Sequence, residues 1–289
     1  MASEAKIPRS DTEQHLHRLA QSSECFDIAM TFRFVLVIAC LLYAVVATAQ
    51  SPAFSVFTET AELGGEPVKV DVYRPDDMES KGVAVLAHGF TRDRLRDRDL
   101  GRALAEAGIT AVAPDLPNLA DHWANGDAVA GLVRDLEGGA LGLPPTPRSR
   151  IVLVGTSFGG LATVIAASHL PGLAGWIGLD PVDGTGSAKR AAARLTSPVV
   201  VLLAEPSACN LFGSGKAIAQ AAPSLLRLER LQGASHCDFE GPTTRLCRVI
   251  CGRSAGMDKV VRREAVAAAQ EMLQYTQEEQ TLIPTPESH

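Results

Sequence analysis

One segment constrains the fold of this chain more than any other: an apolar run that ends in a glycine-flanked serine and continues directly into a second apolar run. The sequence reads Ile151-Val-Leu-Val-Gly155-Thr-Ser157-Phe-Gly159-Gly, followed by Leu161-Ala-Thr-Val-Ile-Ala-Ala. The first run is typical of a strand buried on both faces, and the second is typical of a buried helix. A tight strand-to-helix turn must join them, and glycines two residues before and after the serine relieve backbone clashes there. The segment therefore predicts a nucleophile elbow that lifts the serine hydroxyl above the edge of a sheet.

The rest of the chain alternates in the same way between short β-rich runs and helical stretches. Leu100, Ala103, Leu104 and Ala107 form an amphipathic stripe, and a last helix is expected over about Asp258 to Gln274. The predicted strands are Phe54 to Thr58, Val68 to Tyr73, Val83 to Ala87, Thr110 to Ala113, Ile151 to Val154, Gly175 to Leu179, Pro198 to Ala204 and Leu225 to Leu231. The first two could form a hairpin. The pattern predicts an α/β fold with a mainly parallel sheet of about eight strands flanked by helices.

Residues 30–49 are typical of a secretory signal peptide. The short basic start Met30-Thr-Phe-Arg33 precedes an apolar run from Phe34 to Val46, and Ala47-Thr48-Ala49 is a small-x-small cleavage signature. The run is shorter than the roughly 18 to 20 apolar residues of a spanning helix. We therefore expect a secreted or periplasmic protein with no stable membrane span in its mature form, and an uncleaved anchor is the alternative.

The remaining boundaries follow from this segment. Residues 1–29 are a polar N-terminal extension, which is not expected in front of a signal peptide. Either Met30 is the true start, or the extension is disordered or removed. We expect one catalytic domain over residues 50–275. The tail over residues 276–289 holds two prolines and several charges, and we expect it to be loose.

Charge and composition exclude several classes of protein. The chain has 27 basic and 33 acidic residues and a formal net charge of −6, which argues against binding to a phosphate backbone. Its hydrophobic and charged fractions, 46% and 21%, exclude global disorder. Arg92, Arg94, Arg96 and Arg98 could recognise an anion, but aspartates are interleaved with them, so we expect a solvated loop and helix start.

The four cysteines of the predicted domain all lie in its last third: Cys209, Cys237, Cys247 and Cys251. Even numbers of cysteines in an exported protein predict disulfides, although four reduced thiols or a zinc site are alternatives. If Thr243 to Ile250 is helical, Cys247 and Cys251 lie one turn apart on the same face. Pairing them with each other would constrain little, so we expect each to bond to one of Cys209 and Cys237.

A second motif, Val83-Ala-Val-Leu-Ala-His88-Gly89-Phe90, ends another predicted strand. Acyl transfer through a tetrahedral oxyanion needs two fixed donors, one from the residue after the nucleophile and one from the loop after the third strand. The backbone N–H groups of Phe158 and Phe90 are the natural pair. His88 precedes a glycine at a strand end, and we interpret it as a residue that braces the loop.

A general base must be a histidine downstream of Ser157, and three are candidates. His169 lies about three turns along the helix that follows the serine, and His289 ends the tail. His236 follows the last predicted strand in a loop that would lie above the elbow. We therefore predict His236 as the base.

Together, the order serine, acid, histidine and the His-Gly-Phe and Gly-Thr-Ser-Phe-Gly-Gly segments resemble the α/β-hydrolase superfamily over about Phe54 to Tyr275. The segment Leu179-Asp180-Pro-Val-Asp183-Gly is similar to the Asp-Pro-Val segment of the chlorophyllase and dienelactone-hydrolase-like branch of serine esterases. The resemblance implies the α/β-hydrolase fold. The short stretch between the sixth and seventh strands leaves no room for a large lid domain.

The acid that orients His236 has three candidates. Asp180 and Glu205 end the sixth and seventh strands, and Asp183 could serve or could cap the next helix. The habit of the superfamily favours Glu205. Resemblance to the chlorophyllase-like segment favours Asp180, and aspartate is the commoner acid. We predict Asp180.

The resemblance implies a carboxylic ester hydrolase that works through an acyl-enzyme with Ser157, Asp180 and His236 and uses no cofactor and no metal. We expect a monomer that acts on a small-molecule or lipid-like ester and binds no nucleic acid. An acyltransferase or peptidase with the same three residues is the first alternative. The second is a binding protein that keeps the fold without turnover.

Overall fold

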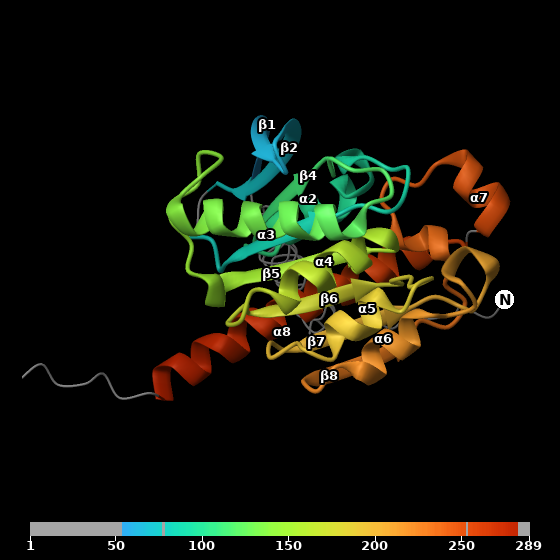
Figure 1. Cartoon of the computed structure of the whole chain (residues 1–289). Coiled ribbons are helices and arrows are strands. Elements are labelled where there is room, and N and C mark those ends of the chain that lie inside the picture. The colour runs from blue at the N-terminus through green and yellow to red at the C-terminus, as the bar shows by residue number, and fades with distance from the viewer. Residues whose placement is uncertain (1–53, 77–78, 253, 283–289) are drawn as a thin grey trace, which may run out of the picture. The chain divides into compact units, whose positions relative to one another are not determined.

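An eight-stranded sheet forms the centre of the structure, a computed structural model that describes residues 54–76, 79–252 and 254–282 (Figure 1). The strand order is β1-β2-β4-β3-β5-β6-β7-β8. β1 and β2 form an antiparallel hairpin, β2 pairs antiparallel with β4, and all other neighbours are parallel. The predicted mainly parallel sheet with an opening hairpin is confirmed. The predicted N-terminal extension and signal peptide lie outside the described residues.

The strands occupy the predicted positions with small shifts at their ends. Their bounds are β1 Phe54–Leu63, β2 Glu66–Pro75, β3 Val83–Ala87, β4 Thr110–Pro114, β5 Ile151–Thr156, β6 Gly175–Leu179, β7 Val199–Leu203 and β8 Leu225–Arg230. The largest difference is β1, which continues to Leu63 because every residue of it pairs with β2 as far as the turn at Gly64 and Gly65. Both turn glycines have positive φ, +62° and +85°. The second half of β1 contains polar residues, so a prediction based on apolar runs does not identify it as part of the strand.

Helices cover both faces of the sheet. Their bounds are α2 Arg98–Glu106, α3 His122–Gly138, α4 Phe158–Ser168, α5 Ser187–Ala192, α6 Gly215–Ala221, α7 Arg245–Cys251 and α8 Met257–Leu282. Helices α3 to α6 pack in one hydrophobic core with the sheet, and α2 and α8 pack in a second core on the other face. The connection between β6 and β7 holds only the short helix α5. There is accordingly no large lid at this position.

Helix α8 continues past the point where we expected a loose tail to begin. It runs from Met257 to Leu282, and the residues after it lie outside the described part of the chain. Its buried side chains include Val261, Ala265 and Met272, as the sequence pattern predicted. Among the described residues, no helix is both long enough and apolar enough to cross a membrane.

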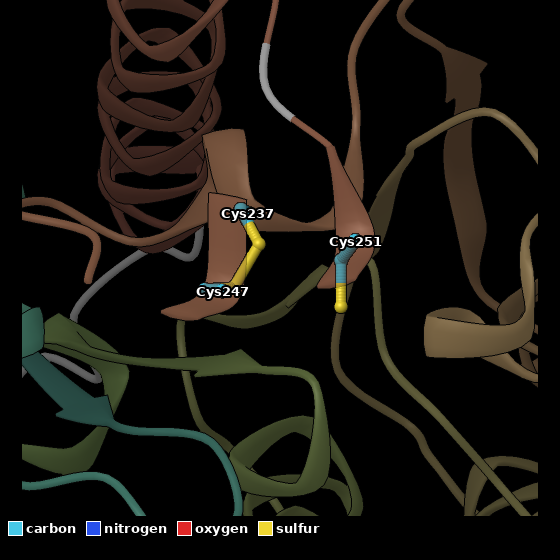
Figure 2. Close-up of side chains that lie close together, drawn as sticks. All are labelled: Cys237, Cys247 and Cys251. Carbon is cyan, nitrogen blue, oxygen red and sulfur yellow. A yellow bond between two sulfur atoms is a disulfide. The ribbon is translucent and has the colours of Figure 1, made fainter. Parts of the chain in front are cut away.

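Two disulfides join the loops after β7 and β8 to helix α7. Cys209 bonds to Cys251 and Cys237 bonds to Cys247, so each helical cysteine pairs with one of the other two, as expected. Figure 2 shows the bond between Cys237 and Cys247 with Cys251 beside it. The sulfur atoms of these three residues lie within 4.8 Å of one another. In this bonded state none of them is the thiolate that a metal ion would need. Disulfides form and persist mainly in oxidising compartments.

The two disulfides should differ in their effect on stability. They close loops with sequence separations of 42 for Cys209–Cys251 and 10 for Cys237–Cys247. In the chain-entropy model these loops stabilise the fold by about 4 and about 3 kcal/mol. We expect the Cys209→Ser/Cys251→Ser variant to unfold at lower urea concentration than Cys237→Ser/Cys247→Ser. Equal midpoints with equal slopes would contradict the entropic account, and peptide mapping without reductant checks the pairing.

Candidate active site

Ser157 lies in the tight turn between β5 and α4. Its backbone has φ 55° and ψ −118°, a strained conformation for a residue other than glycine. A Cβ atom on Gly159 would collide with the carbonyl group of Ala87 in β3, and one on Gly155 would collide with the backbone of Gly159. The predicted need for glycine at both positions is therefore met. The Ser157 side chain is held at the carboxyl end of the sheet, at the first turn of α4.

His236 reaches this serine from the loop after β8. Its Nε2 atom lies 3.0 Å from the Ser157 hydroxyl oxygen, and its Nδ1 atom lies 2.6 Å from Asp180 Oδ2. An ionised carboxylate only accepts hydrogen bonds, so Nδ1 carries a proton and Nε2 is left to accept the serine hydroxyl. His236 belongs to the short 3-10 helix η4 (His236–Phe239), which also contains Cys237. The disulfide of Cys237 thus holds the segment next to the imidazole.

Asp180 is fully buried at the end of β6 and has positive φ, 42°. Besides the His236 imidazole, it accepts a hydrogen bond from the Ala204 amide at 3.0 Å. The side-chain amide of Asn210 donates to both of its oxygens at 3.3 and 3.1 Å. The same amide donates to the Glu205 carbonyl, which ties the carboxylate of Asp180 to the loop after β7. These donors fix the carboxylate in the orientation that faces His236.

The sequence analysis does not identify Asn210 as part of the site, although the spacing of Ser207 and Asn210 is a weak signal. Asn210 is completely buried and ends the 3-10 helix η3 (Ala208–Asn210) next to the disulfide-bonded Cys209. The Asn210 side-chain oxygen accepts a hydrogen bond from the Ser207 amide at 2.8 Å across this helix, which is half of a capping box. Such spacing marks a helix start from sequence, but it does not reveal that the amide nitrogen faces Asp180.

The other candidates for acid and base lie elsewhere. The Glu205 side chain is about half exposed; it accepts a hydrogen bond from the Gly233 amide and has Arg230 at 3.8 Å. Asp183 accepts hydrogen bonds from the Thr185 and Lys189 amides and so caps the start of α5. His169 is the C-cap of α4.

Phe158 and Phe90, the residues predicted to supply the oxyanion donors, both lie close to the serine in the structure. Phe158 is the first residue of α4, and a Cβ on Gly89 would lie 3.4 Å from the Ser157 Cβ, so the loop that carries Phe90 lies against the serine. The two phenylalanine rings pack at a centroid distance of 5.3 Å. Phe90 and Phe158 thus line the same cleft as Ser157.

His88 braces the loop before these amides, as predicted. Its Nε2 atom accepts a hydrogen bond from the Leu116 amide at 3.0 Å, so its Nδ1 atom carries the proton and donates to the Gly89 carbonyl at 2.9 Å. Burial lowers the pKa of His88, which keeps the ring neutral. The ring links the ends of β3 and β4 beside Ser157.

Ser157 and His236 open onto a cleft of about 330 Å³. Its lining is mostly apolar and includes Phe90, Phe158, Val182, Leu211, Cys209, Cys247 and Cys251. A second, smaller cavity of about 60 Å³ shares the Gly89–Arg92 loop and Phe158 and is lined further by Leu116, Leu119 and His122. An apolar cleft with a few convergent polar groups is the usual form of a small-molecule site.

A buried cluster of charges borders the cleft and was not expected. Arg92 and Glu240, which both line it, form an ion pair at 2.6 Å. Asp97 lies behind them, and its Oδ2 atom is buried without a hydrogen-bond partner. Burial, and then the neighbouring Glu240 and Asp93 carboxylates, raise the pKa of Asp97 to about 8. Arg92, Arg94 and Arg96 are therefore mostly buried and ion-paired, and the expectation of a solvated loop is wrong for them, whereas Arg98 is largely exposed.

Comparisons with known proteins agree with this architecture. A family model described as "Alpha/beta hydrolase family" matches residues 84–278. The structure is similar to that of a dienelactone hydrolase from Anabaena variabilis ATCC 29413, with a TM-score of 0.60 and 16% identity over 74% of this chain and 96% of the other. At this identity the similarity concerns the fold. No curated protein matches the sequence.

The raised pKa of Asp97 predicts a pH-dependent stability. The native carboxyl group stays protonated up to about pH 8, whereas in the unfolded chain it ionises near 3.8. Its favourable contribution is complete below pH 3.8 and is lost as the pH rises through 8. Asp97→Asn should therefore leave the free energy of unfolding at pH 4 nearly unchanged and raise it at pH 9 by at least about 1 kcal/mol.

Urea unfolding at both pH values measures this difference. The exposed Asp135, on the surface of α3, provides the control: Asp135→Asn should give the same small change at both pH values. A stability gain for Asp97→Asn that does not depend on pH would contradict the assigned protonation.

Proposed function

Because the chain belongs to the alpha/beta hydrolase family, we propose that it is a carboxylic ester hydrolase in which Ser157 is the nucleophile, His236 the general base and Asp180 the acid. The observation that carries the proposal is the hydrogen-bonded chain from the Ser157 hydroxyl through His236 to Asp180, at 3.0 and 2.6 Å, at the edge of an open cleft. This geometry is what activation of a serine hydroxyl requires.

Hydrolysis would proceed in two steps. His236 takes the proton of Ser157 as the oxygen attacks the ester carbonyl, and then gives it to the leaving alcohol, which leaves an acyl-serine. Water, deprotonated by His236, attacks the acyl group, and His236 then returns that proton to the Ser157 oxygen as the acid is released. The amides of Phe90 and Phe158 would stabilise the oxyanion in each tetrahedral intermediate, helped by the N-terminus of α4. Side chains, two amides and water suffice for this chemistry.

The cleft favours accessible, largely apolar esters. About 330 Å³ is enough for a small ester, and the open mouth suits lipid-like molecules of which only one end enters. The Asp-Pro-Val segment supports placement near the chlorophyllase and dienelactone-hydrolase-like esterases. The proposal includes export of the protein through the signal peptide at residues 30–49 and action as a monomer. The two disulfides support location in an oxidising compartment.

Two alternatives use the same cleft. An acyltransferase or peptidase would share the serine chemistry but would prefer an alcohol acceptor or an amide, which a comparison of p-nitrophenyl esters with anilides and added alcohols distinguishes. A binding protein without turnover would not be covalently labelled by a serine-directed fluorophosphonate.

Loss of the nucleophile or the base should abolish turnover. Ser157→Ala should lower kcat for a p-nitrophenyl ester by about 10⁴-fold or more, and His236→Ala should be nearly as severe. The double variant should be scarcely worse, because the residues act as one unit. His169→Ala, at the exposed end of α4, is the control and should retain full activity. More than about a tenth of the wild-type activity in Ser157→Ala would refute the assignment.

The acid is tested by two isosteric substitutions. Asp180→Asn keeps the shape of the side chain but stabilises the wrong tautomer of His236, and should lower kcat by about 10⁴-fold. Glu205→Gln alters a half-exposed carboxylate and should cost far less. Circular dichroism checks that both variants are folded. If Glu205→Gln were the more damaging change, the acid would instead lie after β7.

A further inference from the structure

Large apolar side chains gather on the surface beside the cleft. Five of them, 45% to 84% exposed, come from the segment after η3 and from α7, and we call them the apolar rim: Leu211, Phe212, Leu246, Val249 and Ile250. Single exposed apolar residues are common on protein surfaces and need no explanation. A group of them on two segments that are joined covalently is different, because such groups mark interaction sites.

The rim is continuous with the candidate active site. Leu211 lines the cleft together with Cys247, Cys209 and Cys251, and the disulfide between the last two joins the rim segments. The Cα atoms of Cys209 and Cys251 are 5.8 Å apart, so the segments lie side by side. Whatever covers the rim therefore meets the mouth of the cleft.

Helix α7 is oriented in the opposite way to an ordinary surface helix. Cys247 is its only buried residue, and disulfides at Cys247 and Cys251 hold one face of the helix against the protein. The other face carries Leu246, Val249 and Ile250 into the solvent. A surface helix normally buries its apolar stripe and exposes polar residues. Figure 1 shows α7 standing apart from the helices that cover the sheet. Two covalent bonds keep these apolar side chains exposed.

The charges of α7 indicate the chemistry of its partner. The sequence Arg245-Leu-Cys-Arg248-Val-Ile-Cys251 contains two arginines and no acidic residue, and both arginines are exposed. The chain as a whole is acidic, with a net charge of −6, so this local positive charge does not reflect the composition. Apolar side chains flanked by arginines are typical of segments that lie on anionic lipid surfaces.

We propose that the apolar rim docks the protein on an anionic lipid surface, with Val249 and Ile250 inserted among the acyl chains and Arg245 and Arg248 at the headgroups. Docking would present the cleft to esters held in that surface, and this part of the proposal rests on the proposed function. A protein partner fits less well, because a rigid surface covering Leu211 would obstruct the cleft. A lipid surface covers the rim and can itself deliver an ester to Ser157.

Binding to vesicles tests the docking without turnover. The full chain carrying Ser157→Ala is mixed with phosphatidylglycerol vesicles or phosphatidylcholine vesicles, and the bound fraction is measured by flotation. Adding Val249→Ser and Ile250→Ser should weaken binding to phosphatidylglycerol vesicles by about tenfold or more, because two aliphatic side chains that would insert among the acyl chains are lost. The matched control adds Val56→Ser and Leu226→Ser, both 46% exposed on β1 and β8, and should bind as before.

A second pair of substitutions tests the charges. Arg245→Gln/Arg248→Gln should bind phosphatidylglycerol several-fold more weakly and lose most of the preference over phosphatidylcholine, and added salt should weaken the wild type in the same direction. Residues 34–46 are identical in every variant, so binding through that apolar run would not respond to changes in α7.

Three results would overturn the docking. They are absence of binding to phosphatidylglycerol, equal binding by the α7 variants, and a wild-type dimer in sedimentation velocity that Val249→Ser/Ile250→Ser converts to monomers, which would make a second copy the occupant. Activity is measured separately with the native serine. Val249→Ser/Ile250→Ser should hydrolyse a dissolved p-nitrophenyl ester at the wild-type rate and a vesicle-embedded ester about tenfold more slowly. If the wild type cleaves neither ester but vesicle binding depends on α7, the esterase proposal fails and the docking stands.

Discussion

The close approach of the α4 backbone to β3 is the contact on which the candidate site depends. A helix can follow β5 after a single residue only if its first turn lies against the carbonyl of Ala87, and any side chain on Gly159 would prevent this. The constraint forces Ser157 into its positive-φ conformation and places the first residue of α4 at the cleft. The hydroxyl and one candidate oxyanion donor are thus fixed by the same turn.

The groups that face Ser157 depend on a different kind of restraint. The loops after β7 and β8 supply Asn210 and His236, and the second loop also packs Leu231, Ala234 and Phe239 into one of the cores. A disulfide lies next to Asn210 and next to His236, at Cys209 and at Cys237. Covalent links here add to the apolar packing, because the short helix α7 buries too little to hold the loops by itself.

The surroundings of the cleft separate into charged and apolar sides. Arg92 and Glu240 are paired at its wall, and the neutral Asp97 behind them limits the buried negative charge to one carboxylate beside the arginine. On the other side Leu211 and α7 expose apolar surface. A substrate that enters would meet a mostly apolar lining, which agrees with a lipid-like ester rather than a highly charged one.

The sequence by itself determined the order of the strands and helices and the position of the turn at Ser157, because buried parallel strands and a glycine-flanked elbow leave strong local patterns. Some strand and helix ends leave no local sequence pattern. Examples are the extension of β1 to Leu63 and the continuation of α8 past residue 276. His236 was selectable because only three histidines follow the serine.

The tertiary structure distinguishes Asp180 from Glu205 by the contacts of their side chains. Both residues end neighbouring strands, so local sequence makes them equivalent. Only the packed structure shows that Asp180 faces the His236 imidazole, while the side chain of Glu205 turns to the Gly233 amide. The contacts of Asn210 and the protonation of Asp97 likewise depend on groups far apart in the sequence, because hydrogen bonds and burial are properties of the assembled fold.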